Sequence, residues 1–184
     1  MLSAFKHQLR TLSSQEKENF VNEIKRRTQV PNASQLADQL HDFVLVLPEM
    51  IAQVRSWMDD PLASRSVKQL HGFMLTYLFH PVDLIPEVTE GLFGYLDDAY
   101  VVGNVYLRTM TPMDPQRVRH LPNLSGISVQ LPIWLDLAQQ VLPIETRKID
   151  SMLDDLCEGN DTSFNQIMEG AVKTLGERSI DELG

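Results

Sequence analysis

Apolar residues recur at three- and four-residue spacings along almost the whole chain. This spacing places them on one face of a helix, and prolines and short polar stretches separate each such segment from the next. The turn pairs that join strands in hairpins do not punctuate the sequence, so the pattern predicts an all-α fold. The predicted helices cover residues 2–12, 13–30, 36–47, 48–58, 61–79, 97–111, 131–142, 143–158 and 163–175.

Three helix starts carry recognisable signals. Ser13 and Glu16 have the spacing of a capping box, which predicts that a second helix begins there. Pro48 is expected in the first turn of its helix, where a missing N–H group costs little. Asp60 followed by Pro61 has the form of an N-cap and a first helical residue, so we expect the next helix to begin at this pair.

The clearest linker is the sequence L-P-N-L-S-G-I-S-V-Q over residues 121–130, because it combines proline, asparagine, serine and glycine. We therefore expect an N-terminal helical extension over residues 1–46 and a compact helical core over residues 47–120. A C-terminal helical extension with an acidic tail would cover residues 121–184. No internal repeat is visible.

The chain is acidic, with a formal net charge of −9, but the charge is unevenly spread. Residues 1–30 hold six Lys or Arg against three Asp or Glu, whereas residues 145–184 hold four against ten. This balance repels a phosphate backbone, and no basic stripe with interleaved aromatic residues occurs. Nucleic acid is therefore not expected as a partner.

The single cysteine, Cys157, excludes a disulfide framework within the chain and fits a reducing compartment. No uncharged apolar stretch is long enough for a secretory signal or a spanning helix, so we expect a cytoplasmic protein. No P-loop, G-x-S-x-G, H-E-x-x-H or EF-hand pattern occurs, and an enzyme is not expected. Four histidines share no motif and are expected at the surface or partly buried: His7, His41, His71 and His120.

The most specific segment is the turn F-H-P-V-D-L-I-P-E over residues 79–87, followed by G-Y-L-D-D over residues 94–98. Pro81 cannot continue a helix, so the preceding helix must end near residue 79. Asp83 is placed to cap the next short turn, in which Pro86 tolerates its missing N–H group.

The residues that follow these prolines have predicted structural roles. Leu84 and Ile85 are expected to close the end of the helical pair with apolar side chains. Asp97 and Asp98 complement the positive end of the next helix and can satisfy its free N–H groups. The turn therefore predicts a helical hairpin whose ends are fixed by proline and aspartate.

Residues 47–109 resemble the YkvA-like family, a helical module of unknown function with the signature Y-L-x-x-P-x-D-L-I-P-D followed by G-Y-L-D-D. Glu87 stands where the family usually has aspartate, and His80 stands where it often has serine. The resemblance implies an all-helical, bacterial, intracellular protein that acts near membranes or within larger proteins, and it implies no reaction. The matching motif residues are Lys68, Tyr77, Pro81, Asp83, Pro86, Gly94, Asp97 and Asp98.

The acids and the histidine of the motif leave two interpretations open. If the two turns face each other, their side chains form a shell suited to Mn²⁺, Mg²⁺ or Zn²⁺, in a metal-binding protein with hydrolytic chemistry. Alternatively the acids cap helices, with one or two paired to Lys68 or Arg65, and no cofactor is bound. We favour the structural role. The candidate metal ligands are His80, Asp83, Glu87, Asp97 and Asp98.

The segment from Met1 to Leu12 has a Leu and Phe face beside basic residues, which suits peripheral contact with a membrane. Packing of this face on the protein's own core or on a partner is the alternative, and we favour it. Because no catalytic pattern is present, we expect a non-catalytic helical adaptor that binds another protein, close to a membrane. The oligomeric state is not predicted.

Overall fold

The structure, a computed structural model, describes residues 2–28, 30–58, 60–61, 63–79, 84–85, 87–111 and 124–158. The side chains of residues 87, 88, 124 and 125 are not described. Helices joined by turns make up this part of the chain and no strand occurs in it, which confirms the predicted all-α class. The α-helices are α1 (Leu2–Thr28), α2 (Ala33–Leu45), α3 (Leu47–Met58), α4 (Arg65–Leu78), α5 (Glu87–Glu90), α6 (Tyr95–Met110), α8 (Leu124–Val141) and α9 (Pro143–Cys157). A 3-10 helix, η1 (Gly91–Gly94), connects α5 to α6.

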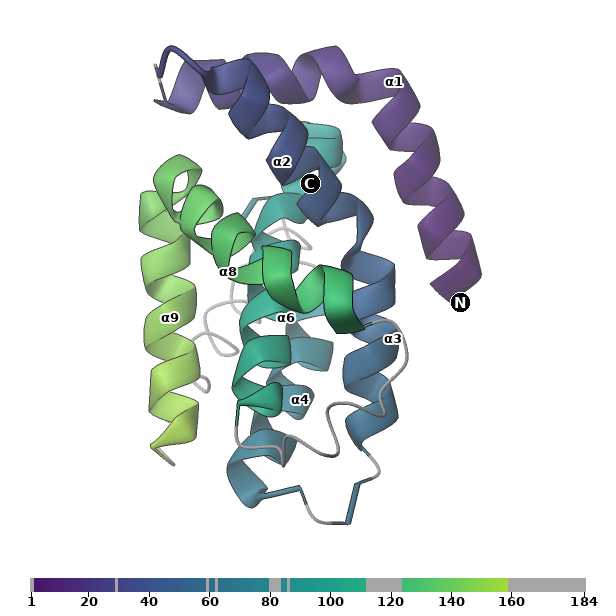
Figure 1. The fold of residues 1–184 in the computed structure, drawn as a ribbon, viewed down its shortest axis with the longest axis vertical. Helices are drawn as coiled ribbons and strands as arrows, with labels where there is room; N and C mark the ends of the chain where they lie inside the picture. Colours follow the sequence, from purple (N-terminus) through teal and green to yellow (C-terminus); the bar gives the residue numbers. More distant parts are fainter. Residues whose placement is uncertain are drawn as a thin grey trace, which may run out of the picture.

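Helix α6 lies at the centre of the molecule, with α2, α3, α4, α8 and α9 packed against it (Figure 1). Most of its residues are buried, among them Leu96, Tyr100 and Tyr106. A helix that is buried on nearly every side carries its polar residues inside with it. Asp97 and Asp98, in the first turn of α6, therefore lie in the interior rather than at the surface.

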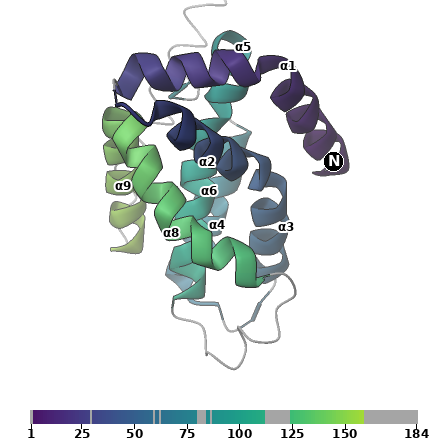
Figure 2. The ribbon, with the colours of Figure 1, turned by 45° about the horizontal axis from the view of Figure 1, so that its top comes forward.

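Helix α1 is one bent helix of 27 residues that lies across the end of the bundle (Figures 1 and 2). The prediction of two helices divided at Ser13 is wrong. The Ser13 hydroxyl lies 2.8 Å from Nε2 of His41 on α2, and the Glu16 carboxylate accepts a hydrogen bond from the Leu92 N–H group at 2.7 Å. The spacing of a capping box is thus used here for two long-range contacts from a helix interior.

Helix α4 begins later than the sequence predicts. Its N-cap is Ser64, whose hydroxyl oxygen accepts a hydrogen bond from the backbone N–H group of Val67 at 3.3 Å. Asp60 and Pro61 precede the helix, where the Asp60 carbonyl accepts a hydrogen bond from the Ala63 N–H group. The predicted start at Asp60 is therefore wrong, because a serine cap four residues later begins the helix.

The predicted linker at residues 121–130 is also wrong over its described part, because α8 begins at Leu124 and includes Pro132. Its buried residues pack against α6, on which Gly103 leaves room for the side chains of Leu131 and Leu135. This packing outweighs the weak helix propensity of Ser125 and Gly126. The predicted helix at 163–175 lies outside the described residues.

Other predicted boundaries are confirmed. Helix α3 begins at Leu47 with Pro48 in its first turn, and α9 begins with Pro143.

Leu9 of α1 belongs to the same hydrophobic core as Leu153 of α9. The boundaries at residues 46 and 120 stay predictions. None of the helices in the described ranges is long and apolar enough to cross a membrane.

Candidate functional site

The carboxylate of Asp97 joins three parts of the predicted motif. Its Oδ2 atom accepts a hydrogen bond from the Tyr77 hydroxyl at 2.7 Å and another from the backbone N–H group of Ile85 at 3.2 Å. Tyr77 lies in the last turn of α4, and Ile85 lies in the turn before α5. Asp97 therefore fixes the end of α4 and the following turn to the start of α6.

Asp97 is fully enclosed, with an exposed fraction of 0%. Burial raises the pKa of its carboxyl group to about 7, although the hydrogen bonds from Tyr77 and from backbone N–H groups oppose this rise. Its second oxygen, Oδ1, is also buried and has no hydrogen-bond partner among the described residues. A carboxyl group with this pKa exchanges its proton near neutral pH.

A cleft that Asp97 does not line, but its neighbour Asp98 does, lies in the same region, and we call it the motif cleft. It has a volume of 420 Å³ and opens between the first turns of α1, helix α3, the end of α4 and the start of α6. Asp98 lines it with an exposed fraction of only 3%. Its lining residues are Leu2, Ala4, Phe5, Gln8, Ile51, Arg55, Leu75, Leu78, Phe79, Tyr95 and Asp98.

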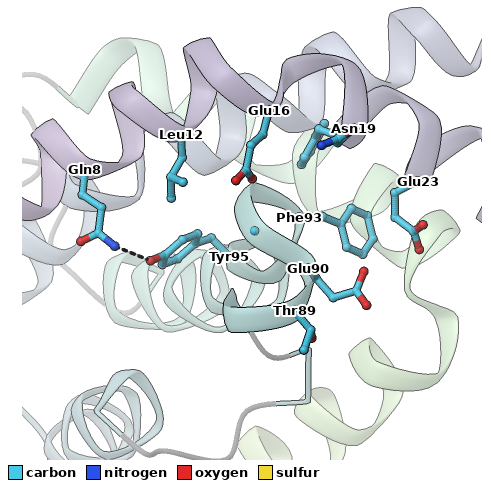
Figure 3. A pocket seen from close by; sticks show the side chains of 11 residues that line it. Gln8, Leu12, Glu16, Asn19, Glu23, Thr89, Glu90, Phe93 and Tyr95 are labelled. Carbon is cyan, nitrogen blue, oxygen red and sulfur yellow. Dashed lines mark hydrogen bonds between the residues drawn. The ribbon is translucent and has the colours of Figure 1, made fainter.

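A second cleft of 640 Å³ lies between α1 and η1 (Figure 3). Gln8 and Tyr95 line both clefts. The Gln8 amide donates a hydrogen bond of 3.1 Å to the Tyr95 hydroxyl, so this pair separates the two clefts. The second cleft carries three carboxylates, from Glu16, Glu23 and Glu90.

Two of these carboxylates already have protein partners. Glu16 accepts the hydrogen bond from Leu92, and hydrogen bonds from Arg26 and Arg27 lower the pKa of Glu23 to about 2 despite its partial burial. The Glu16 contact holds α1 against η1. The Glu23 contacts join side chains within the last turns of α1 itself. The second cleft is therefore better explained as structural than as a site for a cation.

The motif residues fall in different environments. Tyr77 contacts Asp97, Gly94 is buried at the end of η1, and Lys68 is exposed on α4. No ion pair between an acid of the motif and Lys68 or Arg65 is found among the described residues. Three of the motif residues lie outside the described residues, Pro81, Asp83 and Pro86, and so does the candidate ligand His80.

The predicted metal shell is only partly described, because His80 and Asp83 lie outside the description and the Glu87 side chain is not described either. Within the described ranges, no group of three or more His, Cys, Asp or Glu side chains could hold a metal ion. Of the five candidate ligands, only Asp97 and Asp98 have described side chains. They are adjacent in the chain, and both are buried. The metal site stays a prediction.

Sequence reasoning missed two features of this region. The wall of the motif cleft formed by Leu2 and Phe5 is far from the motif in the chain, and no local pattern pairs the two segments. His71 was expected at the surface or partly buried but has an exposed fraction of only 1%, and its Nε2 atom lies 3.0 Å from the Thr109 hydroxyl. Its place beside Leu70 and Met74 on the apolar face of α4 was the available signal.

Residues 67–103 match the model of a family described as protein of unknown function, DUF1232. This stretch, which we call the DUF1232 stretch, runs from α4 to the middle of α6. It contains both partners of the contact between Tyr77 and Asp97. No curated protein and no solved structure matches the chain. The match therefore supports a domain of an unknown-function family over these residues.

Proposed function

We propose that the protein is a non-catalytic interaction module that receives apolar side chains of a partner protein in the motif cleft. The observation that carries this proposal is the composition of the cleft, since eight of its eleven lining residues are apolar or aromatic. Five lining residues come from the DUF1232 stretch: Leu75, Leu78, Phe79, Tyr95 and Asp98.

Phe79 adds to the support because its side chain is 70% exposed at this cleft. A large exposed aromatic side chain beside an apolar hollow is typical of a protein-binding surface, where such residues supply much of the binding energy. Leu75 and Leu78 are partly buried beside it and offer further apolar area. Together these residues form a surface suited to side chains from another protein.

Purification of the tagged full chain under native conditions, with identification of retained proteins by mass spectrometry, tests the proposal. We expect a stoichiometric partner with the unaltered chain and its loss with Phe79→Asp. Ile144→Asp is the matched control, because Ile144 is 61% exposed on α9 and does not line the cleft. Equal retention by the unaltered chain and the Phe79 variant contradicts the proposal.

We also propose that the DUF1232 stretch is a YkvA-like module of a bacterial protein that works in the cytoplasm beside a membrane. The turn and the G-Y-L-D-D segment at residues 94–98 support the family, and the lone cysteine supports a reducing compartment. In α1, Leu9 is buried and Leu2 and Phe5 pack against the core, so the apolar face of this helix is docked on its own protein. Cell fractionation tests the location, and sedimentation with anionic liposomes tests contact through Met1–Leu12.

A divalent-metal site is the second candidate, and the buried Oδ1 atom of Asp97 favours it. A cation beside this oxygen would offset the cost of burying the charged carboxylate. Metal analysis of the native protein and melting temperatures with Mn²⁺, Mg²⁺ or Zn²⁺ test this candidate. A rise in melting temperature that is lost in Asp97→Asn supports it, and no bound metal with no rise contradicts it.

A further inference from the structure

We infer that the segment received by the motif cleft is an acidic amphipathic helix of a partner protein, with a carboxylate that pairs with Arg55. This inference rests on the proposed function, because it names the chemistry of the partner at the same cleft. Its basis is the contrast between the apolar walls of the cleft and its one accessible charge.

The walls of the cleft are helices, and their apolar residues come from separate parts of the chain. Phe5 of α1, Ile51 of α3 and Leu78 of α4 line the hollow together. A groove between helices receives an amphipathic helix through apolar anchors at spacings of three and four residues. The described part of this protein has no strand whose edge could pair with an extended peptide.

The charged residues of the cleft differ in their access to a ligand. Asp98 and Arg55 are the two that line it, and Asp98 is buried whereas Arg55 is exposed in the last turn of α3. The exposed charged group at this cleft is therefore the positive one, Arg55. A carboxylate is the natural partner of a guanidinium group, because the two can form two parallel hydrogen bonds.

Arg55 also differs from other cations near the two clefts. Lys6 pairs with Glu49, and Arg27 pairs with both Glu23 and Glu145. Arg55 has no ion pair with any described residue. Among the described residues it is thus a cation beside an apolar cleft without an ion-pair partner.

Selection of a random peptide display library on the immobilised full chain tests the inference. We expect selected peptides to carry apolar residues at helical spacings and an excess of Asp and Glu over the unselected library. Their dissociation constants would then be measured by fluorescence anisotropy with the unaltered chain and with variants of the full chain. Selected peptides without an acidic excess overturn the inference.

The variants separate the inference from the proposed function. Arg55→Glu is expected to weaken binding of an acidic peptide by about tenfold or more, and a peptide with its acids changed to lysine should recover affinity for that variant. Arg65→Glu is the matched control, because Arg65 is exposed on α4 and does not line the cleft. We expect it to change binding far less.

Loss of binding in Phe79→Asp with no effect of Arg55→Glu overturns the inference and leaves the proposed function standing. Binding that depends on neither residue overturns both. Analytical ultracentrifugation supplies a further arm, since self-association of the chain that Phe79→Asp abolishes identifies a second copy as the occupant and overturns the inference. Binding that requires both Phe79 and Arg55 supports both proposals.

Discussion

The carboxylate of Glu16 on α1 occupies the space into which a side chain at Gly91 would project. The same carboxylate accepts the hydrogen bond from the Leu92 N–H group, so it caps η1 from a different helix (Figure 3). Gly91 has a φ angle of +55°, a conformation that glycine adopts without steric cost. The backbone conformation therefore favours glycine at residue 91, and a side chain there would push the Glu16 carboxylate away from Leu92.

Gly91→Ala is expected to destabilise the protein by about 1–3 kcal/mol, because the new methyl group meets Glu16 and the backbone conformation is strained. Urea unfolding followed by circular dichroism measures the change. Gly72→Ala is the control, since a Cβ atom there would meet nothing within 4 Å in the interior of α4, and it should stabilise by about 0.5–1 kcal/mol. Equal effects of the two substitutions would contradict the constraint at Gly91.

Asp97 should make stability depend on pH in the direction opposite to that of an ordinary paired carboxylate. Its pKa rises from 3.8 to about 7 on folding, so the folded chain binds more protons between these values. The stability contributed by the protonated group is complete below about pH 3.8 and is lost as the pH rises through about 7. The limiting slope is about 1.4 kcal/mol per pH unit.

Unfolding free energies of the unaltered chain and of Asp97→Asn between pH 4 and pH 8 measure this effect. Asparagine can still accept the hydrogen bonds from Tyr77 and Ile85 but carries no charge. We expect the stability of the variant relative to the unaltered chain to increase with pH. A difference that is constant across the range would rule out a raised pKa at Asp97.

His71 should act in the reverse sense. Burial lowers the pKa of its imidazole below 6.5, so the unfolded chain binds more protons than the folded chain around that pH. Stability due to the neutral imidazole is present above about pH 6.5 and is lost as the pH falls through the folded pKa. Between pH 7 and pH 5, the unaltered chain should lose more stability than His71→Gln. Parallel pH profiles would contradict this assignment.

Gly103 provides a test of the packing between α6 and α8. A Cβ atom there would lie 2.9 Å from Cδ1 of Leu131 and 3.1 Å from Cζ of Phe43. Gly103→Val is therefore expected to cost about 1–3 kcal/mol through overpacking. Gly72→Val adds the same side chain in open space within a helix, so the difference between the two variants isolates the packing effect. A difference near zero would show that α8 can move away from α6.

The helical class could be predicted from the sequence because apolar spacing and first-turn prolines are local signals. Pro48 and Pro143 marked the starts of α3 and α9 correctly for this reason. The prediction of a helix start at Ser13 was wrong because the hydrogen-bond partners of Ser13 and Glu16 come from other helices. The predicted linker failed because the buried face of α8 meets α6, which lies earlier in the chain.

The candidate site was predictable in part. The acids of the G-Y-L-D-D segment were singled out, but capping alone did not predict that Asp97 would be enclosed and bonded to Tyr77. The partner of a buried carboxylate depends on how two helices meet, which spacing along one helix does not determine. The motif cleft was beyond local reasoning for the same reason, since its walls come from four helices.

The continuity of α1 has a structural consequence. Measured along its bent axis, at about 1.5 Å per residue, the 27 residues of this helix run for about 40 Å, from Leu2 at the motif cleft to the turn that carries Arg27. Arg27 lies over the ring of Phe93 at 4.8 Å and pairs with Glu145 on α9. Because α1 is one unbroken helix, although bent, the wall of the motif cleft and the contacts of Arg27 belong to a single element of the fold.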